Sequence, residues 1–336
     1  MTIRIINSDV MDGLRSLPDD SVDCVVTSPP YWGLRDYGVE GQIGLEKTPD
    51  EFVARLVEVF REVRRVLKAD GTCWVNLGDS YANDGKWGGS TSGKHVTGLH
   101  GDGIGRGKRD TGLKPKDLVG IPWRVAFALQ ADGWWLRQDI IWAKPNPMPE
   151  SVTDRCTKSH EYVFLLTKSA RYFYDAEAIS EPSIYPGDEG YLRGPIHEAS
   201  DKVTWRAQSQ MDRKKARQNV PKGGFGGKTA DTEQPAFRAI KESRNKRSVW
   251  TIATAPFPEA HFATFPPELP ELCIKAGCRP GGTVLDPFSG AGTTALVADR
   301  LQRHAIGIEL NPTYAAMSER RIASDRGGLL DLMEQA

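Results

Sequence analysis

The sequence predicts an α/β fold of the Rossmann-like kind, a mainly parallel sheet with helices on both faces. Short β-rich runs alternate with helical patterns at both ends of the chain, as in sheets built from β-α-β units. Two loops of unusual composition each follow a predicted strand, which is where such sheets carry their ligands. A long polar stretch interrupts the alternation once and indicates an insertion.

The first half of the chain supplies most of the expected elements. Apolar residues such as Phe52, Leu56 and Phe60 recur at helical spacing. Gly71 is expected to end that helix before the next strand. The expected strands are 3–6, 22–26, 73–77, 134–142 and 162–167, and the expected helices are 10–17, 51–67 and 117–130.

The C-terminal part has the pattern of a compact β-α-β-α run. Strands are expected at 283–285 and 305–308, and helices at 293–301 and 312–322. The strand near 283–286 can lie centrally, beside the strand near 22–27. The carboxyl ends of both strands would then open on the same edge of the sheet, the edge at which open α/β sheets bind ligands.

Composition divides the chain into three parts. Residues 1–179 form the first half of the α/β domain and contain a glycine-rich loop over 82–113, expected to be mobile without a ligand. Residues 180–248 are polar, basic and weakly periodic, which suits an inserted recognition region. Residues 249–336 form the second half of the α/β domain.

Charge is balanced overall but uneven along the chain. The 44 basic residues equal the 44 acidic ones, which argues against indiscriminate binding to nucleic acid. Between Asp201 and Arg247, however, 13 Lys or Arg face 5 Asp or Glu. Such a segment either contacts phosphates or is a solvated charged loop. The candidate phosphate contacts are Arg213, Lys214, Lys215 and Arg217 in this segment, together with Lys86 and Arg106 in the glycine-rich loop.

The five cysteines exclude a disulfide-stabilised scaffold, because their number is odd and their positions are scattered. Cys273 and Cys278 have too few Cys or His neighbours for a zinc site, so no metal is expected. Buried free thiols are the expectation.

A cytoplasmic location is expected from two further features. No stretch approaches the roughly 18 consecutive apolar residues of a membrane span. The first eight residues lack the basic-then-apolar order of a signal peptide.

The first chemical motif is Asp286-Pro287-Phe288-Ser289-Gly290-Ala291-Gly292-Thr293-Thr294, between a predicted strand and a predicted helix. Its small residues let the backbone approach a ligand closely. Glu309 ends the next strand, where a carboxylate can accept both hydroxyls of a ribose. Asp286 would repel a pyrophosphate but pair with an ammonium group, which favours a nucleoside with an amino-acid tail over a dinucleotide.

The second motif is Thr27-Ser28-Pro29-Pro30-Tyr31-Trp32, directly after a predicted strand. Proline stiffens the backbone and has no N–H, so this loop presents hydrogen-bond acceptors rather than donors. Acceptors suit an amino group, whose two hydrogens need partners. Tyr31 offers a ring on which an extruded base can stack. Taken alone, the motif is equally compatible with a rigid turn whose aromatic residue packs into the core.

Together the two motifs resemble those of the DNA amino-methyltransferases. The order, with Ser-Pro-Pro-Tyr first and Asp-Pro-Phe-x-Gly-x-Gly-Thr last, is that of their β group. Most of the chain shares the resemblance, including Trp142–Pro149, Ser159–Lys168, His261–Pro266 and the acidic Asp9.

The resemblance implies a methyltransferase fold, S-adenosylmethionine as the cofactor and double-stranded DNA as the partner. Ser28 and the Pro29 carbonyl would hold the amino hydrogens, Pro30 would set the loop geometry, and Tyr31 would stack on a flipped-out base. The residues that the resemblance and the motifs assign to cofactor binding are Asp9, Thr27, His261, Thr264, Phe265, Pro266, Asp286, Phe288, Ser289, Gly290, Gly292, Thr293, Thr294 and Glu309.

The target base is expected to be cytosine, methylated at N4, with N6 of adenine as the alternative. Within the family, Ser at the first position of the loop is more frequent among N4-cytosine enzymes and Asp among N6-adenine enzymes. No Pro-Cys pair occurs, so the cysteine nucleophile of C5-cytosine methylation is absent. Direct displacement without a covalent enzyme intermediate is therefore expected.

Other functions remain open at this level. The rivals are a methyltransferase for RNA or protein amides and a non-catalytic DNA-binding module. Intact Ser28–Tyr31, Gly290, Gly292 and Glu309 favour the enzyme over the module. A cognate restriction endonuclease is compatible with the resemblance, as are a monomer and a homodimer.

Overall fold

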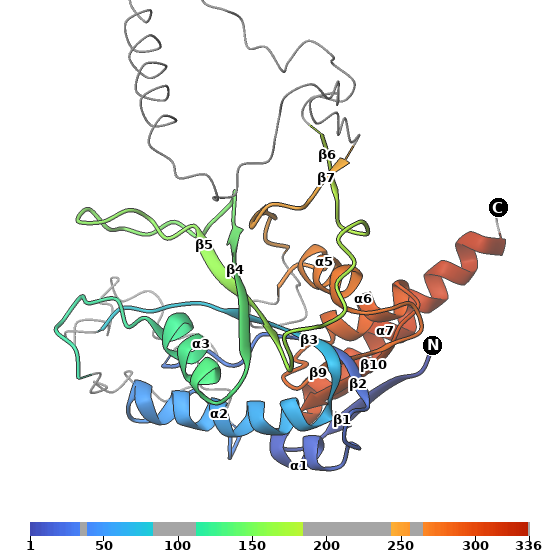
Figure 1. Ribbon diagram of the computed structural model, residues 1–336, viewed down its shortest axis with the longest axis horizontal. Helices are drawn as coiled ribbons and strands as arrows, with labels where there is room; N and C mark the ends of the chain where they lie inside the picture. Colours follow the sequence, from blue (N-terminus) through green and yellow to red (C-terminus); the bar gives the residue numbers. More distant parts are fainter. Residues whose placement is uncertain (34–38, 83–111, 184–242, 256–264, 335–336) are drawn as a thin grey trace, which may run out of the picture. The chain divides into compact units, whose positions relative to one another are not determined.

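The structure is a computed structural model of the 336-residue chain and describes residues 1–33, 39–82, 112–183, 243–255 and 265–334. Two compact units make it up. The first consists of Met1–Ile179 together with Lys246–Ala336, and the second is Ser180–Asn245. Figure 1 shows the elements of both along the chain.

An eight-stranded sheet is the centre of the first unit. Its strand order is β1 (Ile3–Asn7), β10 (His304–Glu309), β9 (Thr283–Asp286), β2 (Val22–Thr27), β3 (Leu67–Leu77), β5 (His160–Thr167), β4 (Trp135–Ala143) and β8 (Val249–Thr251). Only β5 runs antiparallel to its neighbours. β2 and β9 are adjacent and parallel although they are far apart in the sequence: Cys24 pairs with Val284, 260 positions later. The predicted fold class is thus confirmed, with the two motif strands side by side.

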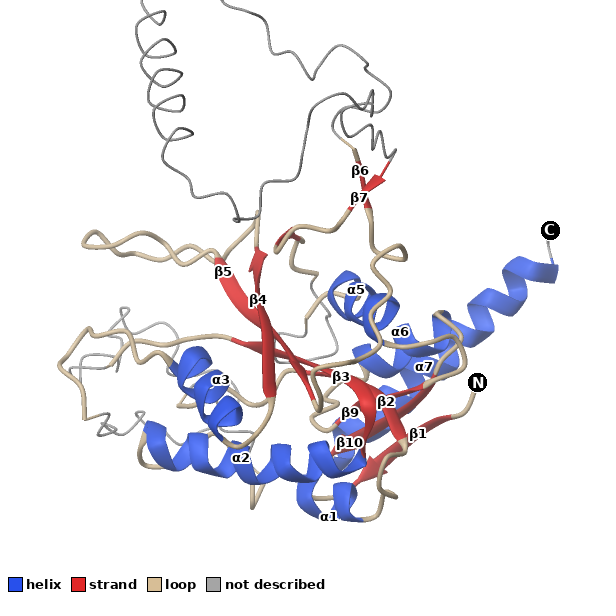
Figure 2. Cartoon of the chain, in the orientation of Figure 1, coloured by secondary structure: helices blue, strands red, loops and turns tan. Residues whose placement is uncertain are grey.

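Helices cover both faces of this sheet, as Figure 2 shows. One face carries α1 (Val10–Arg15), α2 (Pro49–Val66) and α3 (Ile121–Ala131), and the other carries α5 (Glu268–Gly277), α6 (Thr293–Arg300) and α7 (Pro312–Glu334). Successive residues of a strand point to opposite faces of the sheet. Val25 accordingly belongs to the hydrophobic core under α1, α2 and α3, and Val26 belongs to the core under α5, α6 and α7. No helix in the described residues is long and apolar enough to cross a membrane.

Gly71 does not end a helix, contrary to the prediction. α2 ends at Val66, and β3 begins at once with Leu67. The pairing of β2 with β3 shifts register between Val22 and Cys24, and Gly71 lies beside this irregularity. A Cβ on Gly71 would come within 2.9 Å of the Asp23 carbonyl oxygen, so glycine is needed for a bulged strand.

α3 begins later than predicted, at Ile121 rather than at 117. Asp79 explains the start, because its Oδ1 accepts the N–H groups of Gly120 and Ile121 at 3.0 and 3.1 Å. This cap comes from a residue about 40 positions earlier, which helical spacing does not reveal. α5 and β8 were also not predicted.

The cysteine expectation is confirmed for four of the five residues. Cys24, Cys73, Cys273 and Cys278 are buried free thiols, whereas Cys156 is exposed. Cys156 belongs to the connection between β4 and β5, so it has no core around it.

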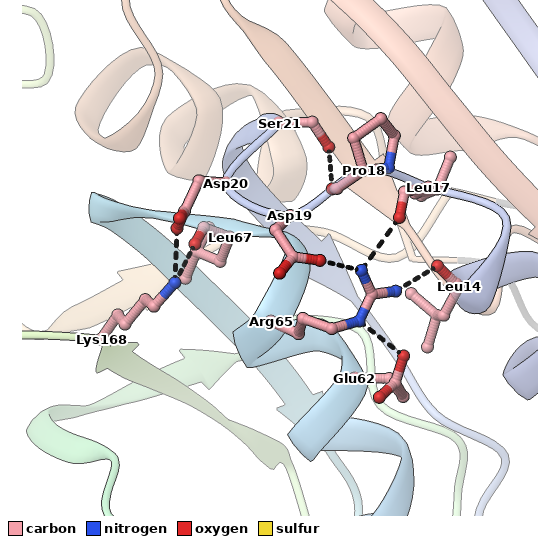
Figure 3. Close-up of polar contacts among 10 residues, drawn as sticks. All are labelled: Leu14, Leu17, Pro18, Asp19, Asp20, Ser21, Glu62, Arg65, Leu67 and Lys168. Carbon is pink, nitrogen blue, oxygen red and sulfur yellow. Dashed lines mark hydrogen bonds and ion pairs between the residues drawn. The ribbon is translucent and has the colours of Figure 1, made fainter.

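Arg65, in the last turn of α2, ties the end of α1 and the connection between α1 and β2 to α2 (Figure 3). Its guanidinium donates to the carbonyls of Leu14 and Leu17 at 2.9 and 3.0 Å, and it pairs with Asp19 and Glu62. Beside it, Lys168 at the end of β5 donates to Asp20 and to the Leu67 carbonyl. These contacts lie at the amino end of β2, the end opposite the Ser28–Tyr31 loop.

We expect Arg65→Ala to lower the free energy of unfolding by about 2 kcal/mol, because two carbonyls and two carboxylates lose their donor. Thermal and urea unfolding measure this change. Arg55→Ala is the matched control, since Arg55 makes only an exposed pair with Glu58 on the same helix and should cost less than about 0.5 kcal/mol. Equal losses in the two variants would contradict a special role for Arg65.

In the second unit the described residues are the two ends of the insertion. β6 (Glu181–Pro182) pairs antiparallel with β7 (Ser243–Arg244), and Arg244 Nη2 lies 3.3 Å from Glu181 Oε2. Lys86, Arg106, Arg213, Lys214, Lys215 and Arg217 lie outside the described residues, as does nearly all of the glycine-rich loop.

Candidate functional site

A cavity of about 990 Å³ opens at the carboxyl ends of the central strands, and both sequence motifs line it. Ser28–Tyr31 follows β2, and Pro287–Ala291 follows β9. Because β2 and β9 are adjacent and parallel, the loops emerge next to each other. Such a volume suits a small-molecule ligand with part of a second reactant.

The Ser28–Tyr31 loop is anchored through the Tyr31 side chain. The Tyr31 hydroxyl donates to Glu161 Oε2 at 2.6 Å, and Asn76 Oδ1 lies 3.3 Å from it. Gly78 leaves room for the ring, since a Cβ there would lie 2.6 Å from Tyr31 Cε2. Residues from β3 and β5 therefore fix the direction in which Tyr31 crosses the cavity.

On the opposite wall, Glu309 is held in place by the backbone. Its Oε2 accepts the N–H of Gly290 at 2.7 Å, and its Oε1 accepts the N–H of Asn311 at 2.8 Å. Burial raises the pKa of this carboxyl, while the two N–H groups favour its ionised form. Gly290 has φ +52, and a Cβ there would meet nothing within 4 Å, so the backbone borders open space.

Asp286 lies behind this wall rather than on it. Asp286 is 2% exposed. Its carboxylate accepts from Thr27 Oγ1 and Thr294 Oγ1, both at 2.7 Å, and from the Phe288 N–H at 3.0 Å. Burial raises the pKa of Asp286 to about 6. The side chains of Thr27, Asp286 and Thr294 thus connect the end of β2 with the end of β9, and this connection fixes the positions of the two motif loops relative to each other.

Gly292 also has a packing role in this structure. It is the residue before α6, with φ +76, and a Cβ there would lie 2.2 Å from Ser318 Oγ on α7. Of the two glycines, only Gly290 therefore borders the cavity.

The structure brings most of the sequence-predicted site residues to one cavity. Those on its wall are Asp9, Ser28, Pro29, Pro30, Tyr31, Phe265, Phe288, Ser289, Gly290, Thr293 and Glu309. Thr27, Pro266, Asp286, Gly292 and Thr294 are described but are not part of the wall. His261 and Thr264 lie outside the described residues. Asp9 also caps α1, because its side chain accepts the Met11 N–H at 2.8 Å.

Polar residues in or next to β3, β4 and β5 complete the wall, and the sequence argument did not assign them to the site. Lys144 pairs with Glu161, and Lys158 Nζ donates to the Asp79 carbonyl at 3.1 Å. Burial lowers the pKa of Lys158. A signal was present, since Lys144, Lys158 and Glu161 belong to or adjoin the two stretches that carry the family resemblance.

The arrangement can align two reactants for direct transfer. One wall offers the Glu309 carboxylate and open space at the Gly290 backbone, and the other offers carbonyl acceptors beside an aromatic ring. A nucleophile at Ser28–Tyr31 would face an electrophile near Gly290 across the same cavity. Alignment and exclusion of water are what an already activated electrophile requires.

Comparisons with known proteins identify the family. A DNA methylase family model matches residues 22–320. The chain is 44% identical to the type II methyltransferase M.SmaI of Serratia marcescens, over 96% of this chain and 91% of that protein. It is 45% identical to M.XycI of Xanthomonas campestris pv. cyanopsidis, over 97% and 89%.

Solved structures share the fold. The PvuII DNA methyltransferase, cytosine-N4-specific by its description, aligns with a TM-score of 0.57 and 19% identity over 97% of this chain and 92% of that one. A candidate DNA modification methylase from Thermus thermophilus, complexed with S-adenosyl-L-methionine, aligns with a TM-score of 0.55 and 22% identity over 96% and 94%. The chain therefore belongs to the DNA methylase family and is a DNA methyltransferase that uses S-adenosylmethionine.

Proposed function

We propose that this enzyme methylates N4 of a cytosine flipped out of duplex DNA. The observation that carries the proposal is Ser28 at the head of the acceptor loop, on the wall of the same cavity as Glu309. Where the adenine enzymes of the family usually place Asp, this loop has a neutral hydroxyl. Ser28 and the Pro29 carbonyl are acceptors for the two hydrogens of an exocyclic amino group.

Each wall has its own task in the proposed reaction. Glu309 accepts the ribose hydroxyls, Gly290 allows close approach of the backbone, and Phe288 and Phe265 supply apolar contacts. S-adenosylmethionine supplies, when bound, a methyl group on a positively charged sulfur. Ser28 and Pro29 hold the amino hydrogens so that the nitrogen lone pair faces this methyl group. The transfer would be a direct displacement, in which the nitrogen–methyl bond forms as the sulfur–methyl bond breaks. S-adenosylhomocysteine would leave, one amino hydrogen would depart as a proton to water, and no enzyme nucleophile would be needed.

The choice of base is tested by mass spectrometry of nucleosides from DNA methylated by the purified protein. We expect N4-methylcytosine. N6-methyladenine as the product would overturn the proposal and support the alternative base. An absence of any methylated nucleoside, together with undetectable heat of S-adenosylmethionine binding, would instead point to a non-catalytic module.

The second unit is our candidate for target recognition. Its sequence is basic, and Arg, Lys, Gln and Asn side chains can contact phosphates or base edges. Double-stranded DNA is the partner in this proposal. The named relatives are type II methyltransferases, which supports a cognate restriction endonuclease as a further partner.

A further inference from the structure

We propose that Lys144, held by Glu161 and the Trp142 ring, donates a hydrogen bond to O2 of the flipped cytosine and so selects cytosine over adenine. The inference rests on the proposed N4 reaction and adds a specificity-determining residue to it. Lys144, Glu161 and Tyr31 all lie on the wall of the cavity that contains the Ser28–Tyr31 loop.

Tyr31 determines which way the base points. The backbone end of its side chain lies beside Ser28 and Pro29, while its hydroxyl reaches Glu161 on β5 at 2.6 Å. A base stacked on this ring, with its amino group at Ser28 and Pro29, extends toward the hydroxyl end. The edge of the base remote from the amino group therefore approaches the pair of Glu161 and Lys144.

The Lys144 side chain is mostly buried, and its neighbours fix its position on the wall of the cavity. Its side chain is 18% exposed and that of Glu161 is 15% exposed. Its ammonium also lies 4.3 Å from the centroid of the Trp142 ring. Trp142 is itself fixed, because its Nε1 donates to the Ile252 carbonyl at 2.8 Å. An ammonium has three N–H donors, so it can bond to Glu161 and to a base together.

The chemistry of the bases explains why such a donor favours cytosine. Beyond the ring nitrogen next to the amino group, cytosine presents the carbonyl O2, a good acceptor. Adenine presents a C–H at the same place on its edge. With adenine, the ammonium would keep its pair with Glu161, but the N–H that faces the base would meet a C–H instead of an acceptor. A mostly buried donor without an acceptor costs free energy, so adenine would be disfavoured.

The test compares two target bases in otherwise identical duplexes. One carries cytosine, and the other carries a 2-aminopyridine C-nucleoside, which keeps the amino group and the adjacent ring nitrogen but lacks O2. The wild type should prefer cytosine in single-turnover rates by about 10- to 100-fold, the worth of one charge-assisted hydrogen bond. In Lys144→Met the single-turnover rate with cytosine should exceed the rate with the analogue by no more than about threefold. Lys144→Arg should retain part of it.

The ratio of the cytosine rate to the 2-aminopyridine rate distinguishes two roles of Lys144: recognition of the base, and positioning of Tyr31 through Glu161. If Lys144 only stabilised Glu161 and Tyr31, both duplexes would slow equally in Lys144→Met, and the unchanged ratio would overturn the inference. Lys68→Met is the matched control: Lys68 makes a lysine–carboxylate pair with Asp23 outside the cavity, and its ratio should equal that of the wild type. N6-methyladenine as the wild-type product would defeat the proposed function itself, which is a different outcome.

Discussion

Glu309→Ala should weaken S-adenosylmethionine binding by about 100-fold or more. A carboxylate that accepts two ribose hydroxyls makes two charge-assisted hydrogen bonds, each worth about 1.5–3 kcal/mol. The wild-type carboxylate is preorganised, because the N–H groups of Gly290 and Asn311 hold its two oxygens at 2.7 and 2.8 Å. Removing it also leaves these N–H groups without their acceptor. Isothermal titration calorimetry of the purified variants measures the affinity.

Two control variants distinguish the loss of the Glu309 contact from a general loss of folding. Glu309→Gln keeps the shape and one oxygen acceptor, so its loss of affinity should be intermediate. Glu271→Ala removes a carboxylate that pairs with Lys275 on α5 and should leave affinity unchanged. If Glu309→Ala melted at the wild-type temperature and bound the cofactor within a few-fold of the wild type, Glu309 would not be the ribose ligand.

The strands and the adjacency of the two loops could be predicted because they depend on local signals. β2 and β9 are short apolar runs that end in Ser-Pro-Pro and Asp-Pro-Phe, and a parallel sheet places such ends on one edge. Glu309 was found for the same reason, since it ends the next strand. The boundaries that failed depend on partners distant in sequence, as with the Asp79 cap of α3 and the bulge at Gly71.

The part of the site contributed by β4 and β5 was beyond the sequence argument. Lys144 directly follows β4 and Glu161 belongs to β5, 17 residues away, and the two strands turn out to be antiparallel neighbours. Alternation along either strand does not say which residue of the other will face it. The buried position of Asp286 was also missed, because a motif shows that a carboxylate is present but not that Thr27 and Thr294 occupy its oxygens.

Tyr31→Ala should lower the methylation rate by about 100-fold, with cofactor affinity unchanged. The variant loses the stacking surface, worth about 1–3 kcal/mol for a base on an aromatic ring. It also loses the bond from the hydroxyl to Glu161, which fixes the ring direction. Tyr31→Phe keeps the ring and loses only this bond, so its rate should lie between those of Tyr31→Ala and the wild type. Single-turnover methylation of a duplex with saturating cofactor measures the chemical step.

Ser28→Ala separates amino-group alignment from stacking on Tyr31. It removes one acceptor from the loop while Pro29, Pro30 and Tyr31 keep their places, so the rate should fall by about 10-fold, the worth of one hydrogen bond. Duplex affinity should stay close to the wild-type value, because the stacking surface remains. Tyr31→Ala should instead weaken the affinity for a duplex whose target base is mispaired and already easy to extrude. If Ser28→Ala and Tyr31→Ala both methylated DNA at the wild-type rate, the Ser28–Tyr31 loop would have no part in the reaction, whatever base the enzyme methylates.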